Sequence, residues 1–196
     1  MTAAILLAAG ESARIGRPKP LLPWGGVTLI EYQVGELRAA GVDDLIVVLG
    51  HAADEVRPRV PQGTRIVVNE AYREGRASSL RAGASALADD ADPIVVLSVD
   101  QPRPRDVIET LLAAHREHAA TITVPIAQGR RGHPVVLAGS LLPELRAASE
   151  ESQGLRGVIA AHQDELFEVE LASPAVLLDI NTPEQYEEAL ARYGEA

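Results

Sequence analysis

Hydrophobic residues in this chain gather in short continuous runs, and segments with helical periodicity separate many of these runs. Several runs are apolar along their whole length and rich in valine and isoleucine, which is typical of strands buried on both faces of a sheet. The runs expected to form strands are residues 3–8, 44–50, 65–69, 93–99, 121–126, 134–138, 166–171 and 175–180.

Four intervening segments repeat apolar residues at the spacing of one helix face. The expected helices lie within residues 28–41, 78–90, 104–118 and 182–194. Gly41 is placed to end the first of them. In the last one, Thr182 is the expected N-cap, Pro183 the first helical residue and Gly194 the stop.

Strands that alternate with helices predict an α/β fold with a Rossmann-like, doubly wound and mostly parallel sheet. The strand runs become denser after residue 120, which predicts a small antiparallel addition. The chain has 196 residues with no repeat or linker, so we expect a single domain over residues 1–196. Ligands of such folds bind beyond the carboxyl ends of the strands, so the segments that follow the strands are the candidate sites.

Amino-acid composition argues against several classes of protein and of site. The net charge of −10 argues against a general nucleic-acid partner. The absence of cysteine excludes disulfides, thiolate metal sites and a cysteine nucleophile. No apolar run approaches the ~18 residues that cross a bilayer, and the first residues lack the pattern of a secretory signal. We therefore expect a cytoplasmic protein with no membrane partner.

The first candidate site is the segment LLAAGESARIGRPKPLLPWGG, residues 6–26, which overlaps the end of the first strand. Gly10 allows close backbone approach, so the loop amides can form an anion-binding nest, and Ser12 and Arg14 add donors. The spacing matches neither a Walker A loop nor the dinucleotide pattern G-x-G-x-x-G. Lys19 is the only lysine among the 18 basic residues, and a lysine is a compact charge that can follow a phosphate. The alternative is an ordinary surface loop.

This segment resembles the signature loop of the MobA-like nucleotidyltransferases, most of all that of the molybdenum cofactor cytidylyltransferase branch. The family pattern is roughly L-A-A-G-x-S-x-R-x-G-x-x-K-x-L-L. The residues that match it are Leu7, Ala8, Ala9, Gly10, Ser12, Arg14, Gly16, Lys19, Leu21 and Leu22. Ile15 replaces the usual methionine or phenylalanine. The resemblance implies a fold of the nucleotide-diphospho-sugar transferase type, and a loop that wraps a nucleotide triphosphate with Arg14 and Lys19 on the phosphates.

Two further segments place oxygen ligands after apolar runs. Asp100 follows the run at 93–99. Its carboxylate has two possible roles: it forms an Asx turn, or it is a Mg²⁺ ligand. The resemblance favours the metal. Residues 179–185 are similar to the family's D-I-D-T-P-E-D, with Asn181 in place of the second aspartate. Asp179 and Asn181 both stay candidate metal ligands beside a helix-capping alternative, and Asp179 ranks first because it alone carries charge.

The resemblance also implies sites for the base and for the acceptor. Residues 75–83 are similar to the element G-x-x-S-S-L-R-x-G that helps to hold the base, which makes Ser78, Ser79 and Gly83 nucleotide-binding candidates; an N-cap is the alternative for the serines. Arg76 stands where many relatives have an apolar residue. The triplet Gly132, His133 and Pro134 recurs on the acceptor side in the cytidylyltransferase branch, although a lone histidine beside a proline is more often structural.

The function implied is transfer of a CMP unit from CTP to the phosphate of a molybdopterin-type cofactor, with Mg²⁺ as cofactor and pyrophosphate as product. Arg14, Lys19 and Asp100 are the implied catalytic residues, and a molybdenum hydroxylase or its maturation factor is a candidate partner. The alternatives are a guanine nucleotide, another phosphate acceptor (a sugar, a polyol or phospholactate), or a non-catalytic protein that binds a nucleotide or cofactor.

Overall fold

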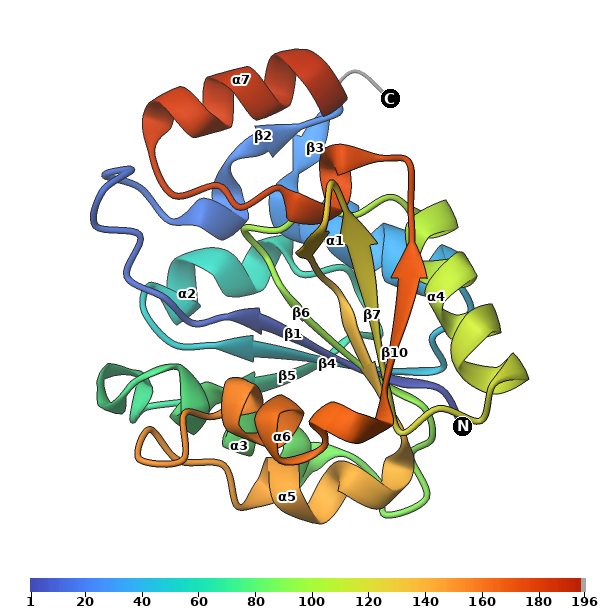
Figure 1. Cartoon of the computed structure of the whole chain (residues 1–196). Coiled ribbons are helices and arrows are strands. Elements are labelled where there is room, and N and C mark those ends of the chain that lie inside the picture. The colour runs from blue at the N-terminus through green and yellow to red at the C-terminus, as the bar shows by residue number, and fades with distance from the viewer. Residues whose placement is uncertain (195–196) are drawn as a thin grey trace.

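The computed structural model describes residues 1–194; residues 195–196 of the expected domain lie outside this range. An eight-stranded sheet lies between two helical layers (Figure 1). The strands follow the order β10-β7-β9-β6-β1-β4-β5, with β8 beside β7. Their bounds are β1 Ala3–Ala8, β4 Asp44–Leu49, β5 Arg65–Val68, β6 Ile94–Ser98, β7 Ile122–Ala127, β8 Arg130–Arg131, β9 Val135–Leu137 and β10 Leu166–Glu170.

Most of the sheet is parallel. β1 pairs in parallel with β4 and β6, β5 pairs in parallel with β4, and β10 pairs in parallel with β7. β9 runs antiparallel between β6 and β7, and the short β8 is antiparallel to β7. The predicted α/β class, the mostly parallel sheet and the antiparallel addition after residue 120 are therefore confirmed.

Two hydrophobic clusters fix the helices on the two faces of the sheet (Figure 1). One face packs against α1 (Leu29–Ala39), α4 (Arg105–Glu117) and α7 (Pro183–Tyr193), together with the hairpin β2 (Pro23–Trp24) and β3 (Val27–Thr28). The other face packs against α3 (Arg76–Ala86), α5 (Leu142–Arg146) and α6 (Leu155–Ala161). The short α2 (Ala53–Val56) follows β4. No helix within residues 1–194 has the length and hydropathy to cross a bilayer.

The predicted helix ends are largely confirmed. Thr182 caps α7 in a reciprocal capping box with Gln185, and Pro183 opens the helix. Gly41 follows α1 with a φ of 84°, the left-handed conformation that glycine adopts without strain. The sequence pattern did not reveal the hairpin β2–β3 or the three short helices α2, α5 and α6.

The strand predicted at residues 175–180 is wrong. Pro174–Leu177 forms a 3₁₀ helix, and the chain after it is extended without a strand partner. The reason is that the carbonyls of Val176 and Leu178 accept hydrogen bonds from the buried side chain of Arg103, at 2.8 and 2.9 Å, instead of from a neighbouring strand.

Gly83 lies where α3 packs so closely on the sheet that a larger side chain does not fit without movement. A Cβ at this position would lie 2.5 Å from Cγ2 of Ile5 and 2.9 Å from Cγ2 of Val48. We expect Gly83→Ala to lower the free energy of unfolding by about 1–3 kcal/mol, measured by urea denaturation, because a packed core resists an added methyl group. Gly35→Ala on the exposed side of α1 is the matched control, since nothing lies within 4 Å of its Cβ position. An unchanged stability in Gly83→Ala would contradict this account.

Candidate active site

A cavity of about 200 Å³ lies at the carboxyl ends of β1 and β6, beside the start of α3. Among the residues proposed for nucleotide binding, those that line it are Leu7, Ala8, Ala9, Gly10, Ser12, Lys19 and Ser79, and Asp100 lines it as well. The hydroxyl of Ser12 accepts a hydrogen bond from the backbone amide of Lys19 at 3.0 Å, which fastens the loop across its own turn. This is the location at which ligands bind in parallel sheets.

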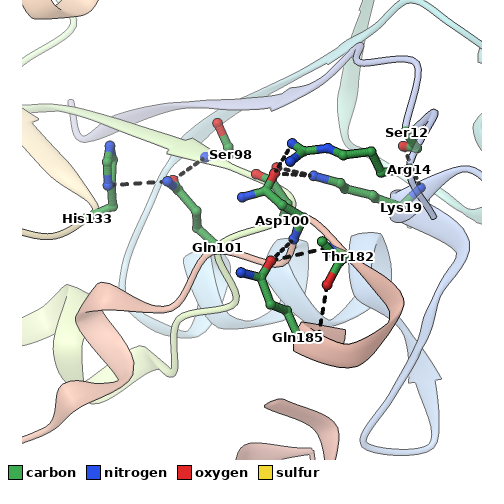
Figure 2. A network of polar contacts seen from close by, with 10 residues as sticks. Ser12, Arg14, Lys19, Ser98, Asp100, Gln101, His133, Thr182 and Gln185 are labelled. Carbon is green, nitrogen blue, oxygen red and sulfur yellow. Dashed lines mark hydrogen bonds and ion pairs between the residues drawn. The ribbon is translucent and has the colours of Figure 1, made fainter. Parts of the chain in front are cut away.

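Three distant segments meet at the ammonium group of Lys19 (Figure 2). Its Nζ lies 2.7 Å from Oδ2 of Asp100 and donates to Oδ1 of Asn181 at 3.0 Å. Arg14 donates to the same oxygen of Asn181 at 3.3 Å. Two cations and two oxygen-bearing side chains from the first loop, the end of β6 and the start of α7 thus form one cluster beside the cavity.

Asp100 has the features of a cation ligand. The residue is 6% exposed, and its Oδ1 is buried with no hydrogen-bond partner among residues 1–194. A buried carboxylate oxygen without a partner is costly, so this oxygen is poised for a group that binds with the substrates. Carboxylate and amide oxygens are ligands that Mg²⁺ and Mn²⁺ accept. The side chains of Asp100 and Asn181 therefore fit a divalent cation.

Asn181, and not Asp179, is paired with Asp100 through Lys19. Ile180 between them is fully buried, and its amide donates to the carbonyl of Asp100 at 2.9 Å. The side chain of Asp179 takes no part in these contacts and lines a second cavity instead. The contacts thus favour Asn181 as the metal ligand, the reverse of the ranking by charge. Within residues 1–194 no three acidic or histidine side chains group into a metal site, so phosphate oxygens would complete the ligand set.

Of the three nucleotide-binding candidates in the segment 75–83, only one lines the cavity. Asn69 donates to the hydroxyls of both Ser78 and Ser79, at 2.8 and 3.0 Å. Ser79 lines the cavity, whereas Ser78 lies within hydrogen-bond distance of two carbonyls of the preceding turn and is 4% exposed. Gly83 packs on the sheet and does not line the cavity. Asn69, a polar residue directly after β5, was not predicted.

The second cavity, of about 520 Å³, shares Leu7, Arg76 and Ser98 with the first. Gly132 and His133 line it, and Pro134 does not. A Cβ on Gly132 would lie 2.2 Å from the carbonyl oxygen of Val176, so this glycine allows close backbone packing.

The imidazole of His133 is neutral and accepts a hydrogen bond from the side-chain amide of Gln101. Its Nδ1 lies 3.2 Å from Nε2 of Gln101, whose Oε1 accepts from the amide of Ser98 at 3.4 Å (Figure 2). This orientation of the amide assigns the proton of His133 to Nε2. Burial, aided by the charge of Arg103, lowers the pKa of His133 to about 4. The ring is therefore uncharged at neutral pH.

Arg103 connects the segments around both cavities, and the sequence pattern did not single it out. It is fully buried, and its guanidinium donates to the carbonyls of Pro102, His133, Val176 and Leu178 at 2.8–2.9 Å. Gln33 of α1 joins the network by bonds to the backbone of Gln101 and Arg103. Burial lowers the pKa of Arg103 to about 9, which still leaves the group charged at neutral pH.

Two known proteins are similar to this chain along most of its length. Nicotine blue oxidoreductase of Paenarthrobacter nicotinovorans is 36% identical over 160 residues, which cover 78% of each chain. The molybdenum cofactor cytidylyltransferase of Escherichia coli K12 is 25% identical over 194 residues, which cover 97% of this chain and 96% of the relative.

Two solved structures superpose on this chain along nearly its whole length. A nucleotidyl transferase from Methanothermobacter thermautotrophicus superposes with a TM-score of 0.82 at 28% identity, and covers 98% of this chain and 97% of its own. Rv0371c of Mycobacterium tuberculosis H37Rv, in a complex with manganese, superposes with a TM-score of 0.80 at 28% identity and covers 97% of both chains. The model of the MobA-like NTP transferase domain matches residues 4–166, so the chain belongs to the MobA-like nucleotidyltransferase family.

Proposed function

We propose that this protein transfers a CMP unit from CTP to the phosphate of a molybdopterin-type cofactor and releases pyrophosphate, with Mg²⁺ as its cofactor. The observation that carries the proposal is the arrangement of two cavities that share lining residues beside the cluster of Lys19, Asp100 and Asn181. A transferase needs this arrangement, because the nucleotide and its acceptor must meet. The similarity to a molybdenum cofactor cytidylyltransferase over 97% of the chain supports the choice of acceptor and of CTP.

The reaction requires alignment and charge neutralisation more than proton transfer. A phosphate monoester has its second pKa near ~6, so the acceptor is already ionised at neutral pH. One of its oxygens attacks the α-phosphorus of CTP, the bond from that phosphorus to the bridging oxygen breaks, and the electron pair leaves with pyrophosphate. The amides of residues 8–12 would bind the triphosphate, and Ser79 would contact the base. Lys19 and Arg14 would stabilise the charge that develops in the transition state.

Asp100 and Asn181 would hold the Mg²⁺, and Asp179 at the second cavity would face the acceptor. The ion would neutralise phosphate oxygens, which is the usual contribution of a divalent metal to such transfers. The manganese complex of a relative supports a divalent metal in this family. The predicted partner, a molybdenum hydroxylase or its maturation factor, follows from the proposed product.

Pyrophosphate release tests the proposal. We expect release that needs both Mg²⁺ and molybdopterin and that is at least about tenfold faster with CTP than with GTP, ATP or UTP, because each 1.4 kcal/mol of base recognition gives a factor of ten. A preference for GTP would move the protein to guanylyl transfer. Tight binding of CTP without release, for molybdopterin and for sugar, polyol and lactate phosphates alike, would indicate a non-catalytic binder.

A redox function is the second candidate, because the relative at 36% identity is named an oxidoreductase. The assay that separates the two is reduction of an electron-accepting dye by NADH or NADPH. Dye reduction without pyrophosphate release would favour the redox function. The loop at residues 6–26 lacks the dinucleotide pattern G-x-G-x-x-G, and the Lys19–Asp100 cluster suits phosphate chemistry, so the transferase is the primary proposal.

A further inference from the structure

The loop between α5 and α6, residues 149–154, forms part of the wall of the second cavity. The residues of this loop that line the cavity are Glu150, Gln153 and Gly154. The sheet contributes three valines to the same lining, namely Val96, Val124 and Val135. Each of these valines is only 2% exposed, although the cavity has a volume of about 520 Å³. The cavity is therefore covered in this conformation, and the loop is part of its cover.

The loop is a compact unit because its hydrogen bonds close it on itself. The amide of Ser149 donates to the hydroxyl of Ser152 at 3.0 Å, and the amide of Ser152 donates to the hydroxyl of Ser149 at 3.2 Å. The amide of Gly154 donates to the carbonyl of Ser149 at 2.9 Å. Such a loop can move as one piece and keep its internal bonds.

The side chain of Glu150 ties this loop to the rest of the molecule. Among residues 1–194, the other hydrogen bonds of the loop stay inside it or reach the first turn of α6. Oε1 of Glu150 accepts from the backbone amide of Ala77, 73 residues earlier in the chain, at 2.5 Å. Ala77 lies in the first turn of α3, whose N-cap Gly75 offers no side chain to cap the helix. The carboxylate of Glu150 therefore supplies this cap, where the helix dipole favours a negative charge.

The chain is anchored on both sides of the loop. Before it, Ala148 is buried. After it, His162 at the end of α6 contacts the carboxylates of Glu144 and Glu165, both at 2.9 Å. Within the loop, Gln153 has a φ of 61°, a left-handed conformation that costs energy in a residue other than glycine. A movement of the loop can thus stay local, and relief of this strain offsets part of the hydrogen bond that opening breaks.

We propose that residues 149–154 are a lid over the second cavity, and that Glu150 holds this lid closed through its contact with the first turn of α3. The lid opens to admit the ligand of the second cavity and closes behind it. Glu150 is then a positioning residue, because it acts through the lid and α3 and touches no reacting atom. The proposal rests on the proposed function only for the identification of the second cavity as the acceptor site, and its test needs no turnover.

The test uses a single introduced thiol, because the chain contains no cysteine. Val124→Cys places the thiol on the covered side of the cavity, where its rate of reaction with an aromatic disulfide follows the population of the open lid. We expect the added substitution Glu150→Ala to raise this rate about tenfold, the effect of losing one charge-assisted hydrogen bond. Glu151→Ala is the matched control and should leave the rate unchanged, because Glu151 is exposed and does not line the cavity.

A second thiol separates opening of the lid from unfolding of the whole chain. Val47 of β4 is fully buried and lines neither cavity, so Val47→Cys should react only through unfolding, at a rate that rises steeply with urea. Opening of the lid exposes little surface, so the rate of Val124→Cys should hardly depend on low concentrations of urea.

Three outcomes would overturn the proposal. The thiol of Val124→Cys reacts as fast as in the unfolded chain, its rate rises with urea as steeply as that of Val47→Cys, or Glu150→Ala accelerates it no more than Glu151→Ala does. Should Val124→Cys fail to fold by circular dichroism, Val135→Cys replaces it, since Val135 lines the same cavity from β9. A lid that opens as expected in a protein that releases no pyrophosphate from CTP would reject the proposed function alone.

Discussion

Replacing Lys19 with alanine is expected to lower the rate of nucleotidyl transfer about 100- to 1000-fold, the usual cost of removing one preorganised donor from a phosphoryl or oxyanion site. The apparent affinity for CTP should change much less, because the backbone amides of the loop still bind the triphosphate. Steady-state kinetics of pyrophosphate release would separate the two effects through kcat and KM. Large and equal losses in both would argue against a role in the transition state.

The contacts of Lys19 also predict how its removal changes the affinity of the protein for a divalent metal ion. In the free protein its ammonium contacts Oδ2 of Asp100 and Oδ1 of Asn181, the two side chains proposed to hold the metal. Removal of the ammonium leaves these oxygens open, so Lys19→Ala should bind Mn²⁺ without nucleotide at least as tightly as the unmodified protein. Arg17→Ala is the matched control, because Arg17 lies in the same loop but contacts the ring of Tyr186 instead of the cluster. This control should keep both activity and metal affinity.

The parts of the fold that depend on local pattern could be predicted from the sequence. The apolar run at residues 3–8 is β1 with the predicted bounds, and the cap at Thr182 opens α7 as expected. The prediction failed at residues 175–180, where the pattern AVLLDI is equally apolar but its carbonyls bind Arg103. Apolar periodicity reports burial and not the hydrogen-bond partner, so a buried arginine far along the chain is invisible to it.

The residues of the candidate site could likewise be predicted only where they are contiguous in the sequence. The loop motif predicts Lys19 and Ser12 because its residues are contiguous, and the structure places both at the first cavity. The choice between Asp179 and Asn181 depends on which of the two side chains contacts Lys19 in the folded chain, and charge carries no information about that contact. The separation of Ser79 from Ser78 likewise depends on Asn69, which contacts both hydroxyls from the end of another strand.

Arg103 is expected to be among the costliest side chains to remove from this protein. Four carbonyl groups accept hydrogen bonds from its guanidinium, and the residue has no solvent exposure. Arg103→Leu would leave three of these carbonyls without their donor, whereas that of Val176 would keep the amide of His133. Because each such group costs on the order of 1–3 kcal/mol and the site will relax in part, we expect the free energy of unfolding to fall by about 3–5 kcal/mol in urea denaturation.

The effect should reach the active site as well as global stability. Arg103 joins the carbonyls that precede Asp179 to that of His133, so its loss leaves the segment that presents Asp179 and Asn181 attached by two backbone bonds alone, Ile180 to Asp100 and His133 to Val176. Arg103→Lys keeps the charge but supplies fewer donors on a flexible stem, so an intermediate loss is expected. Arg105→Leu, two residues further on and exposed at the start of α4, is the matched control and should change stability by less than about 0.5 kcal/mol. A loss below about 1 kcal/mol in Arg103→Leu would mean that water replaces the guanidinium at these carbonyls, and that the segment around Asn181 is held by the capping box of α7 and not by Arg103.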